Sequence, residues 1–162
     1  MNKVSLPDNY YYKEITSLTN VDAFVNIIFL NFPSLIPIEK LKHDKNHIKK
    51  LLTSNKMNGF LVYNKKGVLI AYIIGELMQL NDQRTTFYIS YLYVAKKYRN
   101  KGIAKKLMSL VVSKSKKTGI RNITLTSDTD NIPVYDFYLK WGFMPDPILR
   151  TYDKYDVLTL NL

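Results

Sequence analysis

The sequence contains no cysteine. This absence excludes a disulfide framework, thiol catalysis and a cysteine-ligated zinc site. Histidine is scarce as well: His43 and His47 are the two in the chain, and they stand at helical i, i+4 spacing in a lysine-rich stretch. That spacing would suit a zinc pair, but no third ligand is evident, and two solvated histidines on a helix face are the favoured interpretation. We therefore expect no metal site.

Long hydrophobic runs are also missing. The longest, Val68–Ile74, is far too short to cross a bilayer. The first residues, 1–12, lack the apolar segment of a signal peptide. We expect a soluble, intracellular protein with a cytoplasmic location and no membrane partner.

Acidic residues are few: the chain has 13 Asp and Glu and 24 Lys and Arg, which gives a formal net charge of +11. Such a charge favours a polyanionic partner, which could be nucleic acid, a membrane surface or a phosphorylated cofactor. It does not choose among them. Asn, Lys, Ile and Tyr are all abundant, so an AT-rich genome is another source of the lysines.

No linker, repeat or low-complexity block divides the chain, so residues 1–162 are expected to form one domain. Alternating apolar residues and turn residues predict strands at 12–18, 59–64, 68–80, 85–94, 121–127, 148–152 and 156–160. Helical spacing predicts a helix capped by Asp22 and stopped by Pro33, helices at 38–54 and 102–118, and a helix capped by Asn131 and ended by Gly142. Strand 121–127 should lie parallel to strand 85–94 through a right-handed crossover. The predicted fold is α/β, with a mixed, mostly antiparallel central sheet and about four helices.

Two motifs follow the predicted three-strand meander. The first is a basic loop between a strand and a helix, Tyr98-Arg-Asn-Lys-Gly-Ile-Ala104. A helix N-terminus offers unpaired N–H groups and a partial positive charge, which together favour an anion. Gly102 would let a phosphate approach the backbone. Taken alone, the motif is weak, and a solvated basic loop is the favoured interpretation.

The second motif is Asn131-Ile-Pro-Val-Tyr-Asp-Phe-Tyr-Leu-Lys-Trp-Gly-Phe143. By itself it could be the core face of a helix, with Val134, Phe137, Tyr138 and Trp141 at helical spacing. The two motifs together resemble the signatures of the GCN5-related N-acetyltransferase (GNAT) superfamily. Leu92-Tyr-Val94 with Arg99-Asn-Lys-Gly-Ile-Ala104 fits the first signature, and Asn131, Tyr138, Gly142 and Phe143 fit the second without a gap.

The sequence departs from the family pattern at three positions. Lys96 stands where the family often has Pro, Asn100 where it often has a second Gly, and Val134 where Ala is usual. Asparagine tolerates left-handed backbone better than most residues, so we expect Asn100 to support a phosphate-binding loop.

The resemblance implies a cofactor, acetyl-CoA, and an amine acceptor. In such enzymes the diphosphate of the cofactor lies on the loop, here Arg99, Asn100, Lys101, Gly102, Ile103 and Ala104. The pantetheine arm would lie beside backbone groups of Leu92, Tyr93 and Val94, between two splayed parallel strands. Asn131 would bind the pantetheine or adenine part. Tyr138 is placed like the general acid of the family, and a phenol stays protonated at neutral pH.

The general base is not settled by the sequence. Strand 85–94 has no carboxylate, so Glu76 on the preceding strand is the candidate base, with Asp128 and a water chain as alternatives. Glu76 could instead be a solvent-facing strand residue. Two other functions also stay open: a CoA-binding module without turnover, and, less favoured, a basic nucleic-acid-binding protein. A homodimer is compatible with the sequence.

Overall fold

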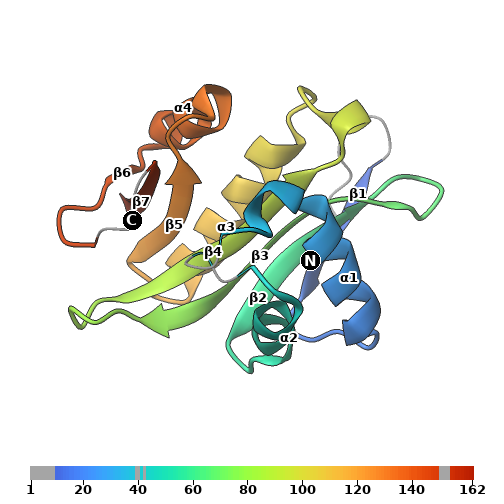
Figure 1. The fold of residues 1–162 in the computed structure, drawn as a ribbon, viewed down its shortest axis with the longest axis horizontal. Coiled ribbons are helices and arrows are strands. Elements are labelled where there is room, and N and C mark those ends of the chain that lie inside the picture. Colours follow the sequence, from blue (N-terminus) through green and yellow to red (C-terminus); the bar gives the residue numbers. More distant parts are fainter. Residues whose placement is uncertain (1–9, 39–40, 42, 150–153) are drawn as a thin grey trace.

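The computed structural model describes residues 10–38, 41, 43–149 and 154–162, and its centre is a seven-stranded sheet in the order β1-β2-β3-β4-β5-β7-β6 (Figure 1). The strands are β1 (Tyr11–Ile15), β2 (Met57–Tyr63), β3 (Leu69–Gln79), β4 (Thr85–Val94), β5 (Asn122–Asp128), β6 (Met144–Pro145) and β7 (Tyr155–Asn161). All neighbouring strands are antiparallel except β4 and β5, which are parallel. The predicted mixed sheet is therefore confirmed.

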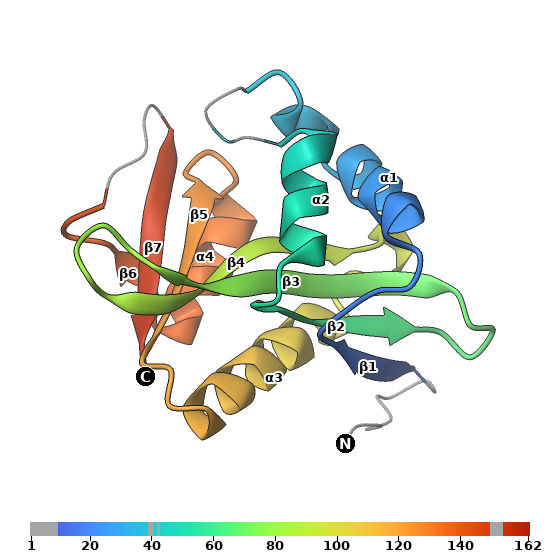
Figure 2. The same cartoon turned by 90° about the horizontal axis from the view of Figure 1, so that it is seen from below.

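The helices lie on both faces of the sheet. They are α1 (Val21–Asn31), α2 (Lys45–Thr53), α3 (Ile103–Lys117) and α4 (Ile132–Trp141), with short 3-10 helices at Pro33–Leu35 and Lys96–Tyr98. Figure 2 shows α1 and α2 on one face and α3 on the other. Tyr138 of α4 shares a core with Leu107 and Met108 of α3, whereas Ile28 of α1 and Leu52 of α2 share a second core. The sheet thus separates two apolar cores.

A β-bulge at Ser90 divides strand β4. Ile74 of β3 pairs with Tyr91 and Gly75 pairs with Ile89, which leaves Ser90 as the extra residue. Because a bulge inserts one residue, it reverses the alternation of side chains beyond it and bends the strand. Ile89 and Leu92 therefore both pack in the α3 core, while Tyr91 and Tyr93 pack against the core of α1 and α2.

Glycine is required opposite this bulge. A Cβ built on Gly75 would lie 2.2 Å from the carbonyl oxygen of Tyr88 and 2.9 Å from the ring of Phe87. Any side chain at position 75 would therefore push β4 away from β3 where β4 changes direction.

Two predicted helix starts were wrong. Asn20, rather than Asp22, occupies the N-cap position of α1, and Asp22 lies in the first turn. The helix predicted at 38–54 begins only at Lys45, because Asp44 caps it: the backbone N–H of His47 donates to Asp44 Oδ1 over 2.9 Å. Residues 39, 40 and 42 of that range lie outside the described residues.

The two histidines have different environments. His47 is solvated on α2, as predicted, with 42% of its side chain exposed. The same prediction was wrong for His43, which precedes α2 and is buried. Its Nε2–H donates to the carbonyl oxygen of Phe29 over 3.1 Å, since a carbonyl can only accept, and its Nδ1 lies 2.7 Å from the hydroxyl of Tyr91. His43 therefore joins the segment before α2 to strand β4.

The strand predicted at 148–152 is not found among its described residues. Met144 and Pro145 form β6 instead, antiparallel to β7, and residues 150–152 of the predicted range lie outside the described part. Asp146 ends β6 and turns the chain, because its Oδ1 accepts the backbone N–H groups of Ile148 and Leu149, each over 2.9 Å.

Asp146 also joins the β3–β4 turn to strand β7. Its side chain is 0% exposed and is paired with Arg84, whose Nη1 donates to Asp146 Oδ2 over 2.9 Å. The hydroxyl of Thr159 donates to the same oxygen over 2.8 Å. Burial alone raises the pKa of Asp146, but the hydrogen bonds from Arg84, Leu149, Ile148 and Thr159 outweigh it and hold the pKa well below its usual range.

Replacing Asp146 by Ala is expected to lower the free energy of unfolding by about 3 kcal/mol, because it removes one partner of the buried ion pair with Arg84. The loss should not be larger, because Arg84 keeps its second ion pair, with Asp82. Urea denaturation measures this change. The matched control is Asp22→Ala, which removes a surface pair with Lys49 and should cost less than about 1 kcal/mol. Equal losses in the two variants would contradict the prediction.

Asp146 should also make stability depend on pH. A carboxyl whose pKa is lower in the folded state stabilises the fold above its unfolded pKa of about 3.9, and this contribution is lost as the pH falls below that value. The wild-type protein should therefore lose more stability than Asp146→Asn between pH 6 and pH 3, as measured in the same denaturation series.

Candidate active site

Strands β4 and β5 separate soon after they meet. Their paired positions are Phe87 with Ile123 and Tyr88 with Thr124. Beyond Tyr88, β4 continues to Val94 beside β3, while β5 continues to Asp128 beside β7 (Figure 1). Within the described residues, the facing edges of β4 and β5 past these two pairs have no strand partner, so their backbone groups are available to a ligand of extended shape.

The N-terminus of α3 lies just beyond the end of β4. Gly102 is its N-cap residue, with φ of 84°, and no side chain caps the helix. A Cβ at Gly102 would meet nothing within 4 Å, so the space in front of the first turn is open. Asn100 has φ of 63°, which is the left-handed conformation expected for it. The unpaired N–H groups of the first turn and the open space suit an anionic group.

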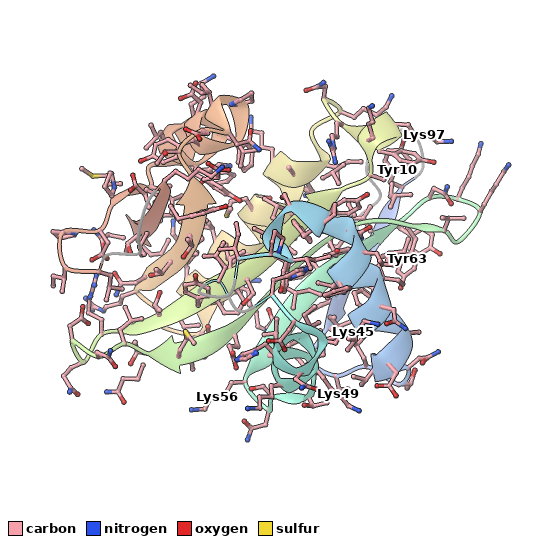
Figure 3. All side chains as sticks on the ribbon, viewed as in Figure 1. Tyr10, Lys45, Lys49, Lys56, Tyr63 and Lys97 are labelled. Carbon is pink, nitrogen blue, oxygen red and sulfur yellow. The ribbon has the colours of Figure 1, made fainter. Side chains whose placement is uncertain are left out.

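Basic side chains surround this helix end. Lys96, Lys97, Arg99 and Lys101 are all exposed. Lys97 lies near Tyr10 at the end of the sheet where β4 leads into α3 (Figure 3). Nε of Arg99 donates to the carbonyl oxygen of Val94 over 2.8 Å, and the guanidinium lies 6.0 Å from the ring centroid of Tyr93. Arg99 therefore anchors the loop to the end of β4. Further lysines lie on α2 and after it: Lys45 and Lys49 contact Phe29 and Asp22 of α1, and Lys56 follows the helix (Figure 3).

Helix α4 brings Tyr138 toward the core shared with α3. The ring of Tyr138 is 8% exposed and packs edge-on against Phe137 and Phe143. Burial raises the pKa of Tyr138 above its ordinary value, so the phenol keeps its proton at neutral pH. Val134, which helical spacing places on the same face of α4, is 41% exposed, so this face is not simply a core face.

Asn131 is at the N-cap position of α4, as predicted, but its side chain makes no capping hydrogen bond. It is exposed near the end of β5, and its backbone N–H donates to the carbonyl oxygen of Asp128 over 3.2 Å. The side-chain amide of Asn131 therefore stays available to a ligand.

A second group of residues lies on the opposite face of the sheet. Glu76 of β3 is opposite Tyr88 of β4 in the strand register, and the Tyr88 hydroxyl lies 2.6 Å from Oγ1 of Thr126 on β5. Burial raises the pKa of Tyr88, although the bond to Thr126 lowers it in part. Sequence reasoning missed Tyr88 and Thr126, because only the tertiary structure shows that they meet across the point where β4 and β5 separate.

Comparisons with known proteins agree with this geometry. The model of the acetyltransferase (GNAT) family matches residues 21–143, which is most of the chain. The chain belongs to this family. Among curated proteins, "N-alpha-acetyltransferase MAK3" of Arabidopsis thaliana is 31% identical over 87 residues, which are 52% of this chain and 44% of that protein. The chain thus spans less than half the length of that relative.

Solved structures show the same fold. Arabidopsis thaliana NAA60 in complex with acetyl-CoA superposes with a TM-score of 0.68 at 16% identity, covering 94% of this chain and 97% of NAA60. Arabidopsis thaliana Naa50 in complex with the bisubstrate analogue CoA-Ac-MVNAL also gives a TM-score of 0.68, at 19% identity, covering 93% of this chain and 99% of Naa50. The GNAT fold predicted from the two motifs is thereby confirmed. No helix within the described residues is long and apolar enough to span a membrane.

Proposed function

We propose that residues 1–162 act as an acetyl-CoA-dependent N-acetyltransferase. The observation that carries the proposal is the separation of β4 and β5 directly beside the open N-terminus of α3. An extended thioester can lie in such an opening while its diphosphate contacts the helix end. The donor set fits a diphosphate, because it combines N–H groups of the first turn with the cationic side chains of Arg99 and Lys101.

The loop residues then have distinct roles. Backbone groups of Asn100, Gly102, Ile103 and Ala104 would hold the diphosphate, and Lys101 would add charge. Backbone groups of Leu92, Tyr93 and Val94 would bind the pantetheine arm. A backbone N–H that points at the thioester oxygen stabilises the negative charge that develops there. One such donor typically lowers the activation free energy by about 3 kcal/mol. Asn131, with its free amide, would bind the arm or the adenine part.

Proton transfers are assigned to two side chains. Tyr138 would donate a proton to the departing thiolate, since its raised pKa keeps the phenol protonated. Glu76 would accept a proton from the amine, because it lies beside Tyr88 on the face opposite α3. Replacing Glu76 by Gln should lower kcat and leave the Kd for CoA unchanged, which steady-state kinetics and calorimetry measure together. An unchanged kcat would remove Glu76 from the mechanism.

We propose the α-amino group of a peptide as the acceptor. Both MAK3, by its name, and Naa50, by its bisubstrate analogue, point to this class. An α-amino group has a pKa of about 7.7–8.0, so roughly one molecule in ten is neutral at pH 7, against about one in a few thousand for a lysine side chain. A half-exposed carboxylate such as Glu76 is therefore a sufficient base for an α-amine.

A thiol-release assay with four acceptors tests the proposal: a short peptide with a free N-terminus, an N-terminally blocked peptide with one lysine, a polyamine and an aminoglycoside. Thiol release with the first peptide, and a mass increase of one acetyl group on its N-terminus, is the expected result. CoA binding without turnover on any acceptor would favour a binding module. Salt-sensitive DNA binding without CoA binding would favour the nucleic-acid alternative. We also propose a cytoplasmic location, which cell fractionation would test.

A further inference from the structure

Ser127 of β5 carries a buried hydroxyl without a partner. The residue is 4% exposed, and among the described residues its Oγ is the buried side-chain polar atom that has no hydrogen bond. Leaving a buried hydroxyl unpaired destabilises a fold, and an apolar residue at the same place would avoid that cost. When a native protein keeps such an unpaired hydroxyl, a bound ligand is one explanation, because the ligand can supply the hydrogen-bond partner.

The two threonine hydroxyls of β5 are both paired. Thr124 Oγ1 lies 2.8 Å from Oγ1 of Thr86 and 3.2 Å from Oγ1 of Thr159, and Thr126 Oγ1 lies 2.6 Å from the hydroxyl of Tyr88. These residues share one face of the sheet. Because side chains alternate along a strand, Ser127 points to the other face of the sheet, as Ile123 and Leu125 do. Ile123 and Leu125 belong to the core beneath α3 and α4. A hydroxyl therefore stands where the strand pattern calls for an apolar side chain.

The position of Ser127 along β5 suggests the missing partner. The last residue of β5 that pairs with β4 is Thr124, opposite Tyr88. Ser127 follows in the separated part of the strand, where β7 pairs with it through Asp156 and β4 does not. Its side chain is on the face where α3 begins and where Tyr138 lies. A ligand that enters between β4 and β5 from the α3 side would pass Ser127.

We infer that the Ser127 hydroxyl is a positioning group for the pantetheine arm of the acyl donor. The arm contains two amides, and each amide that enters the opening loses water and needs a hydrogen-bond partner. A serine hydroxyl can donate to an amide oxygen or accept from an amide N–H. Ser127 thus supplies from β5 a contact that complements the backbone of β4. This inference rests on the proposed function.

Calorimetry with two ligands tests the inference. CoA carries the arm, whereas adenosine 3′,5′-bisphosphate carries the nucleotide phosphates without it. In Ser127→Ala, the Kd for CoA should rise about three- to tenfold, as for the loss of one neutral hydrogen bond, while the Kd for the bisphosphate stays unchanged. The Tm of the variant should not fall, because the replacement removes an unpaired polar group. The control is Ser109→Ala, since Ser109 Oγ already donates to the carbonyl oxygen of Lys106 within α3. That variant should bind both ligands as the wild type does.

Two results would overturn the assignment. An unchanged Kd for CoA in Ser127→Ala would make the hydroxyl a local packing feature. Equal losses for CoA and for the bisphosphate would mean that the substitution acts on the whole site and not on the arm. Failure of the proposed CoA site looks different, because the wild-type protein would then bind neither ligand. Failure of turnover alone is seen in the thiol-release assay and leaves the wild-type Kd for CoA measurable.

Discussion

Replacing Gly102 by Glu is expected to abolish binding of CoA and acetyl-CoA. The substitution puts a side chain into the open space before the first turn of α3, where the diphosphate is proposed to lie. It also puts a negative charge beside two phosphates. A carboxylate at a helix N-terminus interacts favourably with the helix dipole, so the charge itself should not unfold α3. Calorimetry at millimolar ligand should detect no binding heat, where the wild type binds.

The matched control for this variant is Gly67→Glu. Gly67 has φ of 79° and Gly102 has φ of 84°, so both variants carry a side chain in the left-handed region. A Cβ at Gly67 also meets nothing within 4 Å, but this residue lies in the turn between β2 and β3. Backbone strain of roughly 1–2 kcal/mol is therefore common to the two variants. Binding of CoA by Gly102→Glu at wild-type strength would place the diphosphate elsewhere.

Replacing Tyr138 by Phe is expected to lower kcat on the order of 10²-fold and to leave the Kd for CoA unchanged. The ring keeps its packing against Phe137 and Phe143, and the hydroxyl has no hydrogen bond to any described residue, so no partner is left unpaired. What the variant would lose is the proposed proton donor to the departing thiolate. Single-turnover kinetics and calorimetry on the same preparation separate the two quantities.

Tyr135→Phe is the control in the same helix. The hydroxyl of Tyr135 donates to Asp156 Oδ2 over 2.9 Å, so its removal costs a structural hydrogen bond. We expect a lower Tm and a nearly unchanged kcat. A wild-type kcat in Tyr138→Phe would remove Tyr138 from the mechanism, even if CoA binding and the fold were as described.

Local sequence patterns were sufficient for most of the fold and for the loop that begins α3. Strand alternation and helical spacing depend on neighbours in the chain, so the meander, the crossover helix and the left-handed backbone of Asn100 were predicted correctly. Patterns failed where side chains from distant segments set the structure. The carboxylate of Asp146 is buried because Arg84 and Thr159 donate to it, and the ring of His43 is buried where Phe29 and Tyr91 bind its nitrogens.

The sequence by itself determined the family, the basic loop at 99–104 and the position of Tyr138 in its motif, because these depend on residue identity and short spacing. Only the tertiary structure decided how the candidate site is built. The bulge at Ser90 puts Leu92 on the same face as Ile89 and Tyr91 on the other face. Ser127, whose hydroxyl is unpaired, lies in the part of β5 that no longer pairs with β4. Both features depend on which strands pair and where the pairing stops, which is set by contacts between residues far apart in the chain.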